Sequence, residues 1–157
     1  MEFVEQILGI SYSTRKSLKM KKLLKYIFLF ATGGSLYYIV ELLFRGYSHW
    51  SMFILGSICF NYAGIQNEYT SWDYPLWKQL LKVESFVLIS EFITGCIVNL
   101  WLGWNVWDYS YLTGNILGQT SWQFALLFLP LCLAAIILDD YLRYWIFKEE
   151  KPYYKLY

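Results

Sequence analysis

The sequence predicts an all-α membrane protein with four transmembrane helices and both termini in the cytoplasm. Three observations lead to this prediction: the composition, four long apolar segments, and the uneven distribution of positive charge. The chain has 157 residues, of which 57% are hydrophobic, 22% aromatic and only 16% charged. Soluble domains are about 45–50% apolar and about 25% charged, so this composition favours a bilayer environment. The length suits a single domain.

Four apolar segments are interpreted as membrane spans, at about residues 26–44, 50–66, 83–103 and 122–142. About 20 apolar residues are needed to cross the hydrocarbon core, and the second segment is the shortest. Pro75 fits the first turn of a helix, so the third helix is expected to begin as a turn on the membrane surface. Pro130 is expected to kink the fourth helix, because proline removes a backbone hydrogen bond.

The positive charges predict how these helices are oriented. Residues 1–25 form a basic N-terminal segment whose first ten residues fit a short amphipathic helix, residues 26–148 the transmembrane domain, and residues 149–157 a charged tail. Four spans place both termini on one side, and that side then holds all 13 Lys and Arg residues except Arg45. The positive-inside rule assigns this side to the cytoplasm.

Acidic residues inside the third segment are the first candidates for function. Glu84 and Glu91 are seven residues apart, so they share a helix face about 10 Å apart along the axis. Glu84 is expected near the cytoplasmic interface, where Lys82 and water satisfy it, and Asn99 lies about two turns beyond Glu91. Glu91 is expected near the middle of the bilayer. An ionised acid there costs at least ~2.5–3.5 kcal/mol, so it must be paired, hydrated or protonated.

Two hypotheses stay open for Glu91. In one, Glu91 belongs to a path for an ion, a proton or a substrate. In the other it is a protonated structural residue that bonds to Asn61 or to a tyrosine such as Tyr38. In the first segment, Glu41 and Arg45 have the i,i+4 spacing of an ion pair at the outer end. The candidate intramembrane polar site therefore consists of Glu91, Glu84, Asn99, Asn61 and Glu41.

The loop at residues 104–121 is a second candidate site. It contains Asp108, Asn115 and Gln119 among many aromatic residues, and it has no Lys or Arg. The loop is too apolar to extend freely into water, so we expect it to fold back onto the outer face of the membrane. Its side chains suit either the binding of a sugar or lipid headgroup or the closing of the helix bundle as a lid, and we favour the lid.

Other kinds of site are disfavoured by the residues present. Cys59, Cys96 and Cys132 follow neither a metal-ligand nor a CxxC spacing. The single histidine, His49, cannot build a multi-histidine metal centre or a credible catalytic triad. No GxxxxGK[ST] loop is present to bind ATP. We therefore expect no metal, no cofactor, no nucleic-acid partner and no enzymatic activity.

Three strings in the sequence resemble a known family. They are SFVLISEFITGCIVN, then VWDYS with NILGQ shortly after it, and LDDYLRYWIFKEEKPYY. The motifs at Trp107–Ser110 and Asp139–Tyr144 are the most distinctive, and the similarity extends from about Tyr26 to the C-terminus. The chain resembles the bacterial ABC-transporter type IV family, also called CmpB-like. The resemblance implies a small multi-pass protein of the bacterial plasma membrane that acts in transport.

These observations lead to hypotheses of different classes. In the first, the chain is a membrane component of a transport assembly, in contact with lipid and with copies of itself or a separate ATPase subunit. In the second, it is a structural or regulatory cell-envelope protein without transport activity. A third hypothesis, an embedded enzyme acting on a lipid-linked sugar, would use Asp108, Glu41 or Glu91.

Overall fold

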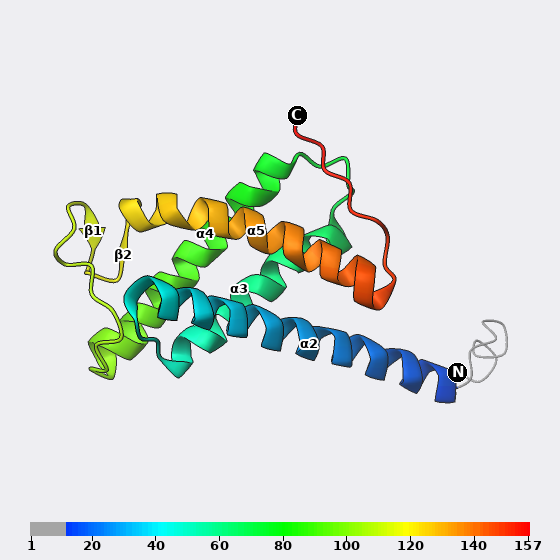
Figure 1. The fold of residues 1–157 in the computed structure, drawn as a ribbon, viewed down its shortest axis with the longest axis horizontal. Coiled ribbons are helices and arrows are strands. Elements are labelled where there is room, and N and C mark those ends of the chain that lie inside the picture. The colour runs from blue at the N-terminus through cyan, green and yellow to red at the C-terminus, as the bar shows by residue number, and fades with distance from the viewer. Residues whose placement is uncertain (1–11) are drawn as a thin grey trace.

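Four helices make up most of the computed structural model, which describes residues 12–157 (Figure 1). They are α2 (Tyr12–Arg45), α3 (Trp50–Tyr69), α4 (Leu76–Gly95) and α5 (Trp122–Phe147). Three helical segments are long and apolar enough to cross a membrane, namely Thr14–Arg45, Leu76–Trp101 and Trp122–Phe147. The prediction of a mainly helical fold is therefore confirmed, and three of the helical segments are candidate membrane spans. The predicted second span is helical as α3, but it is outside this group because its second half is rich in polar residues.

Helix α2 is longer than the predicted first span. Its 34 residues include the basic run, since Lys, Leu and Met all favour helix. A helix of this length extends about 50 Å, whereas the hydrocarbon core is about 30 Å thick. The N-terminal part of α2 extends past the other helices (Figure 1). The predicted amphipathic helix in the first ten residues lies outside the described residues.

Helix α4 begins at the position that Pro75 predicts for the third helix. It starts directly after Pro75 and continues into a π-helical turn, η1 (Cys96–Trp101). The third segment is therefore one continuous helix over Leu76–Trp101. A π-turn widens the helix locally and is frequently found at functional sites. Here the turn contains the buried side chain of Asn99.

A short hairpin follows within the loop at residues 104–121, which we call the outer loop. Strands β1 (Asn115–Ile116) and β2 (Thr120–Ser121) pair in antiparallel fashion. Leu117 and Gly118 both have positive φ, at 53° and 69°, as in the type I′ turns that match the twist of a hairpin. Ser121 then caps α5, because its hydroxyl accepts a hydrogen bond from the backbone N–H of Phe124.

Helix α5 contains Pro130 and remains one helix on both sides of it, ending at Phe147 rather than at the predicted residue 142. Lys148 then takes a left-handed conformation (φ 59°) that reverses the chain. The tail returns toward the start of α4 (Figure 1), where the backbone N–H of Leu76 donates to the carbonyl of Lys155 at 2.8 Å.

Close approach at small residues holds the helices together. A Cβ atom at Gly34 would lie 2.1 Å from the Ser57 hydroxyl of α3. A Cβ atom at Gly64 would lie 1.7 Å from a carboxyl oxygen of Asp139 on α5. Small residues allow this proximity between membrane helices. The end of the bundle that holds Arg45 and the outer loop is called the outer end, and the opposite one the inner end.

Gly64→Ala is expected to destabilise the protein, because the added methyl group overlaps Asp139 and forces α3 and α5 apart. Overpacking of this kind costs about 1–3 kcal/mol. Unfolding in detergent, followed by tryptophan fluorescence, measures the loss. Ser85→Ala is the matched control, since Ser85 is exposed and its hydroxyl bonds only to the backbone of its own helix. Equal stability of the two variants would contradict the close α3–α5 contact.

Candidate functional site

Glu91 is buried toward the outer half of the bundle and is held by the outer loop. Its side chain is 2% exposed. One carboxyl oxygen accepts a hydrogen bond from the Tyr109 hydroxyl and the other from the Thr120 hydroxyl, each at 3.0 Å. A tyrosine does bond to Glu91, as one of the predicted alternatives has it, but it is Tyr109 rather than Tyr38, and Asn61 is not a partner. The outer loop folds back between the helices, so its hydroxyl groups, rather than Asn61 or Tyr38, bond to the Glu91 carboxyl group.

Asn99 and Gln119 fasten the outer loop to the bundle. The Asn99 amide donates to the side-chain oxygen of Gln119 at 2.8 Å, and its own oxygen accepts from the backbone N–H of Val106 at 2.7 Å. The Trp107 indole N–H donates to the Gln119 carbonyl at 2.9 Å. All four residues are buried. The loop therefore covers the outer end of the bundle, which is the geometry of a lid.

Asp108 and Asn115 stabilise the shape of the outer loop itself. The exposed Asp108 carboxylate accepts from the hydroxyl and the backbone N–H of Ser110, at 2.6 and 2.8 Å, and these bonds lower the pKa of Asp108. Asn115 accepts from the backbone N–H of Gly118 at 2.8 Å and donates to the Leu112 carbonyl at 2.7 Å. Both residues are explained by local turn structure.

The predicted pair of Glu41 and Arg45 is confirmed. Their side chains meet at 2.6 Å, and the Ser48 hydroxyl donates to the same Glu41 oxygen at 2.8 Å. Arg45 also donates to the carbonyl of Val106 at 3.0 Å. The pair therefore links the outer end of α2 to the outer loop.

Glu84 and Asn61 lie apart from the outer site. Glu84 is 7% exposed, and in the described part of the chain neither of its carboxyl oxygens has a hydrogen-bond partner. The expectation that Lys82 satisfies it is wrong, because Lys82 points outward, 4.3 Å from the centre of the Tyr74 ring. Asn61 is half-buried, and its side-chain oxygen likewise has no partner among the described residues.

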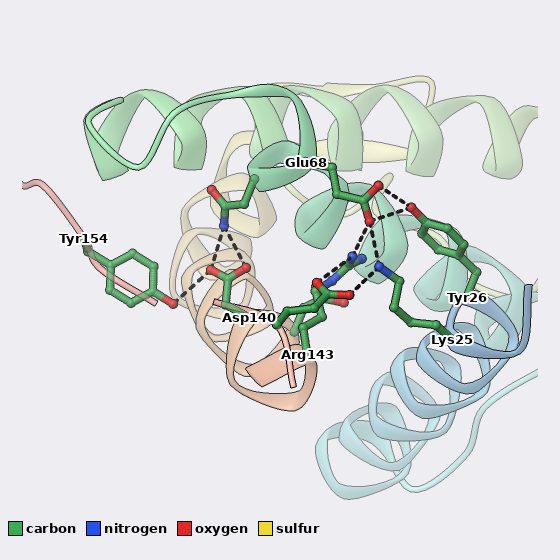
Figure 2. Close-up of polar contacts among 9 residues, drawn as sticks. Lys25, Tyr26, Glu68, Asp140, Arg143 and Tyr154 are labelled. Atoms are coloured by element: carbon green, nitrogen blue, oxygen red, sulfur yellow. Dashed lines mark hydrogen bonds and ion pairs between the residues drawn. The ribbon is translucent and has the colours of Figure 1, made fainter. Parts of the chain in front are cut away.

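A cluster of ionic residues at the inner end was not selected from the sequence. Arg143 of α5 lies at its centre, 2.6 Å from a carboxyl oxygen of Glu68 and in direct contact with Asp139 (Figure 2). Lys25 of α2 lies 3.0 Å from Glu68 and 2.7 Å from Glu149. These pairs join α2, α3, α5 and the tail at one point.

Neutral side chains complete this inner cluster. The Tyr26 hydroxyl lies 2.6 Å from both oxygens of Glu68. Asp140 accepts from the Asn67 amide at 2.7 and 2.8 Å and from the Tyr154 hydroxyl at 2.9 Å (Figure 2). Asp139, Asp140 and Arg143 are 0%, 3% and 4% exposed. The inner cluster is thus an ionic network with a buried centre and an exposed edge at Glu68, comprising Lys25, Tyr26, Asn67, Glu68, Asp139, Asp140, Arg143, Glu149 and Tyr154.

The inner cluster strongly favours the ionised form of Glu68. Partial burial, the largest single effect, opposes ionisation, but hydrogen bonds from Tyr26, Lys25 and Arg143 outweigh it and lower the pKa of Glu68 to about 2. The acids of the cluster do not form a metal centre. Across residues 12–157 there is no group of three or more His, Cys, Asp or Glu side chains that could hold a metal ion.

An apolar groove of about 280 Å³ lies between the two polar ends. Its mouth is between α2 and α5, where Leu36 and Leu138 are exposed. Glu91 is the only Asp, Glu, Lys or Arg among the described residues that line the groove, and Tyr37 lies beside it in the wall. Further walls are provided by Val40, Phe60, Val87, Phe128, Leu131 and Ala135.

Comparisons with family models, with curated proteins and with solved structures found no match for this chain. The resemblance to the CmpB-like family therefore stays a prediction from the sequence.

Asn99→Leu is expected to release the outer loop, because the Val106 N–H and the Gln119 side chain lose their buried partner. Each unsatisfied group costs about 1–3 kcal/mol. Hydrogen exchange across residues 104–121 should rise by at least about tenfold, which corresponds to about 1.4 kcal/mol. Tyr111→Phe is the control, since Tyr111 is an exposed residue of the same loop. Unchanged protection in the Asn99 variant would show that the amide does not fasten the loop.

Glu68 is expected to make stability depend on acid pH. Its pKa is about 2 in the folded chain against an ordinary 4.5, so its contribution is complete above pH 4.5 and is lost as pH falls toward 2. Melting temperatures measured across this range should therefore fall less steeply for Glu68→Gln than for the wild type. Glu150→Gln, at an exposed position, should keep the wild-type profile. Parallel profiles for wild type and Glu68→Gln would contradict this role.

Proposed function

We propose that the chain is a membrane component of a transport assembly that works with a separate ATPase subunit, in the bacterial plasma membrane. One observation carries the proposal: Glu91 is held by an ordered loop on the wall of a groove within the membrane-spanning helices. In many transporter folds the substrate site is near the bilayer midplane, and a membrane-buried acid is a functional candidate by default. The sequence motifs for nucleotide binding are absent, so the energy source is assigned to a partner.

We further propose that α3 is a fourth span and that both termini are cytoplasmic. Helix α3 runs beside α2 from the Arg45 end to the Lys25 end, and Lys25 pairs with Glu68 near the end of α3. The predicted span within α3, residues 50–66, is at the short end of the ~17–25 residues that cross the hydrocarbon core, and it leaves Glu68 at the edge of the membrane. This geometry supports a crossing despite the polar residues of α3, because Asn67 and Glu68 bond to side chains of α5 and α2.

The N-terminal part of α2 is the surface that we assign to the ATPase subunit. Arg15, Lys16 and Lys19 are exposed there, together with the apolar side chains of Leu18 and Leu23. This part of α2 extends beyond the bundle (Figure 1). An exposed helix with both cationic and apolar side chains suits an acidic partner surface with an apolar groove.

The alternative is a structural or regulatory envelope protein. It is favoured by the hydrogen bonds that both Glu91 oxygens make within the chain. In that reading the inner cluster and the outer loop only stabilise the fold.

Co-purification in mild detergent distinguishes the two functions. We expect a tagged chain to retain a partner with ATPase activity, and a photo-crosslinker at Lys19 to reach that partner. Charge reversal by Lys16→Glu with Lys19→Glu should abolish retention, because the helix loses its attraction to an acidic surface. Lys82→Glu, on the exposed face of α4, is the matched control. A strictly monomeric wild-type chain without ATPase activity would favour the envelope protein.

A further inference from the structure

We propose that the groove between α2 and α5 binds a lipophilic cation, with the Glu91 carboxylate as its counter-ion. The binding of a cation is inferred from the groove alone. The further statement that this cation is the substrate of a transport assembly also rests on the proposed function.

The shape and lining of the groove select an apolar ligand. Its volume of about 280 Å³ is nearly twice that of an engineered apolar cavity of about 150 Å³ that binds benzene. Apart from Glu91 and the Tyr37 hydroxyl, the walls consist mainly of aliphatic and aromatic side chains. A compact body of phenyl or short alkyl groups fits such a space better than a hydrated ion.

The charges around the groove select a cation. Glu91 makes no ion pair with any described residue, and Arg45 is held by Glu41 and by the carbonyl of Val106. Two hydroxyl groups stabilise the Glu91 carboxylate, yet an ionised acid at this depth still lacks a positive partner. A bound cation supplies that charge. The rings of Tyr37, Phe60 and Phe128 in the same walls favour a cation as well, since aromatic faces attract positive charge.

The position of the opening explains why the ligand must be lipophilic. The outer loop covers the aqueous outer end, and its anchors Asn99 and Gln119 are buried. The mouth of the groove is instead on the side of α2 and α5, where Leu36, Ala134 and Leu138 are exposed within membrane-spanning segments. A ligand therefore enters from the bilayer. A neutral lipid chain would fill the groove without compensating Glu91, and an anion would be repelled by it.

Binding of methyltriphenylphosphonium to the chain in lipid nanodiscs tests the proposal. Its neutral counterpart of nearly the same shape is triphenylphosphine oxide. We expect saturable binding of the cation to the wild type, and an affinity at least about tenfold lower for the neutral compound, equivalent to about 1.4 kcal/mol. Equal affinities for the two compounds, or no saturable binding of the cation, would overturn the proposal.

Variants identify the residue that recognises the charge. Glu91→Gln keeps the size and a hydrogen-bond acceptor but removes the charge, so cation affinity should fall at least about tenfold. Glu84→Gln is the matched control, because Glu84 is a second buried acid on α4 that does not line the groove; it should retain affinity within about twofold. If the Glu91 variant binds the cation as tightly as the wild type, another residue recognises the charge, and Glu91 is not the counter-ion.

A second pair of variants keeps the proposal testable if the Glu91 variant does not fold. Ala135→Phe fills the groove and should abolish cation binding, whereas Ile89→Phe, on the exposed face of α4 outside the groove, should not. Binding by the Ala135 variant at wild-type affinity would contradict the assigned site. These assays use the chain without an ATPase. If no ATPase partner co-purifies, the proposed function is refuted but the cation site is not. If the cation does not bind, the cation site is refuted but the proposed function is not.

Discussion

The ionic network around Arg143 is the interaction on which the arrangement of the helices depends. Charged groups inside an apolar bundle are costly unless other groups of the protein satisfy them. Asp139 is paired with Arg143 on the same helix, whereas Glu68, Asp140 and Glu149 bond to residues of other elements. Arg143 and Lys25 join Glu68 near the end of α3 to α5 and α2, and Glu149 extends the network into the tail. Removing Arg143, which is 4% exposed, leaves the fully buried Asp139 uncompensated, at a cost of about 3–5 kcal/mol. The network therefore fixes which ends of the helices meet.

The outer end uses uncharged groups for the same purpose. Hydroxyl and amide side chains of the outer loop satisfy Glu91 and Asn99, so the loop is ordered although it has little regular structure. Between the two polar ends, the helices enclose an apolar groove rather than a continuous polar path. This division explains why the groove, with one acid in its wall, is the part of the molecule suited to bind a ligand.

The sequence predicted the features that depend on local spacing and missed those that depend on contacts across the chain. Apolar length predicted the helices, and the spacing of Glu41 and Arg45 predicted their ion pair. The partners of Glu91 lie 18 and 29 residues away in the loop, where no periodicity indicates them. The predicted second span ends at about residue 66, where polar residues end the apolar run, yet α3 continues to Tyr69 and brings Glu68 to Arg143. The i,i+4 spacing of Asp139 and Arg143 was the available signal for the inner cluster.

A double-mutant cycle on Glu68 and Arg143 tests the central claim most directly, because the two residues belong to different helices. The free energy of unfolding would be measured for the wild type, Glu68→Gln, Arg143→Gln and the double variant. If the network orders the helices, the double variant loses less stability than the two single variants combined, with a coupling of about 1–3 kcal/mol. If the losses of unfolding free energy are additive within about 0.5 kcal/mol, Glu68 and Arg143 do not stabilise the contact between α3 and α5. That result would contradict the role of the network in ordering the helices.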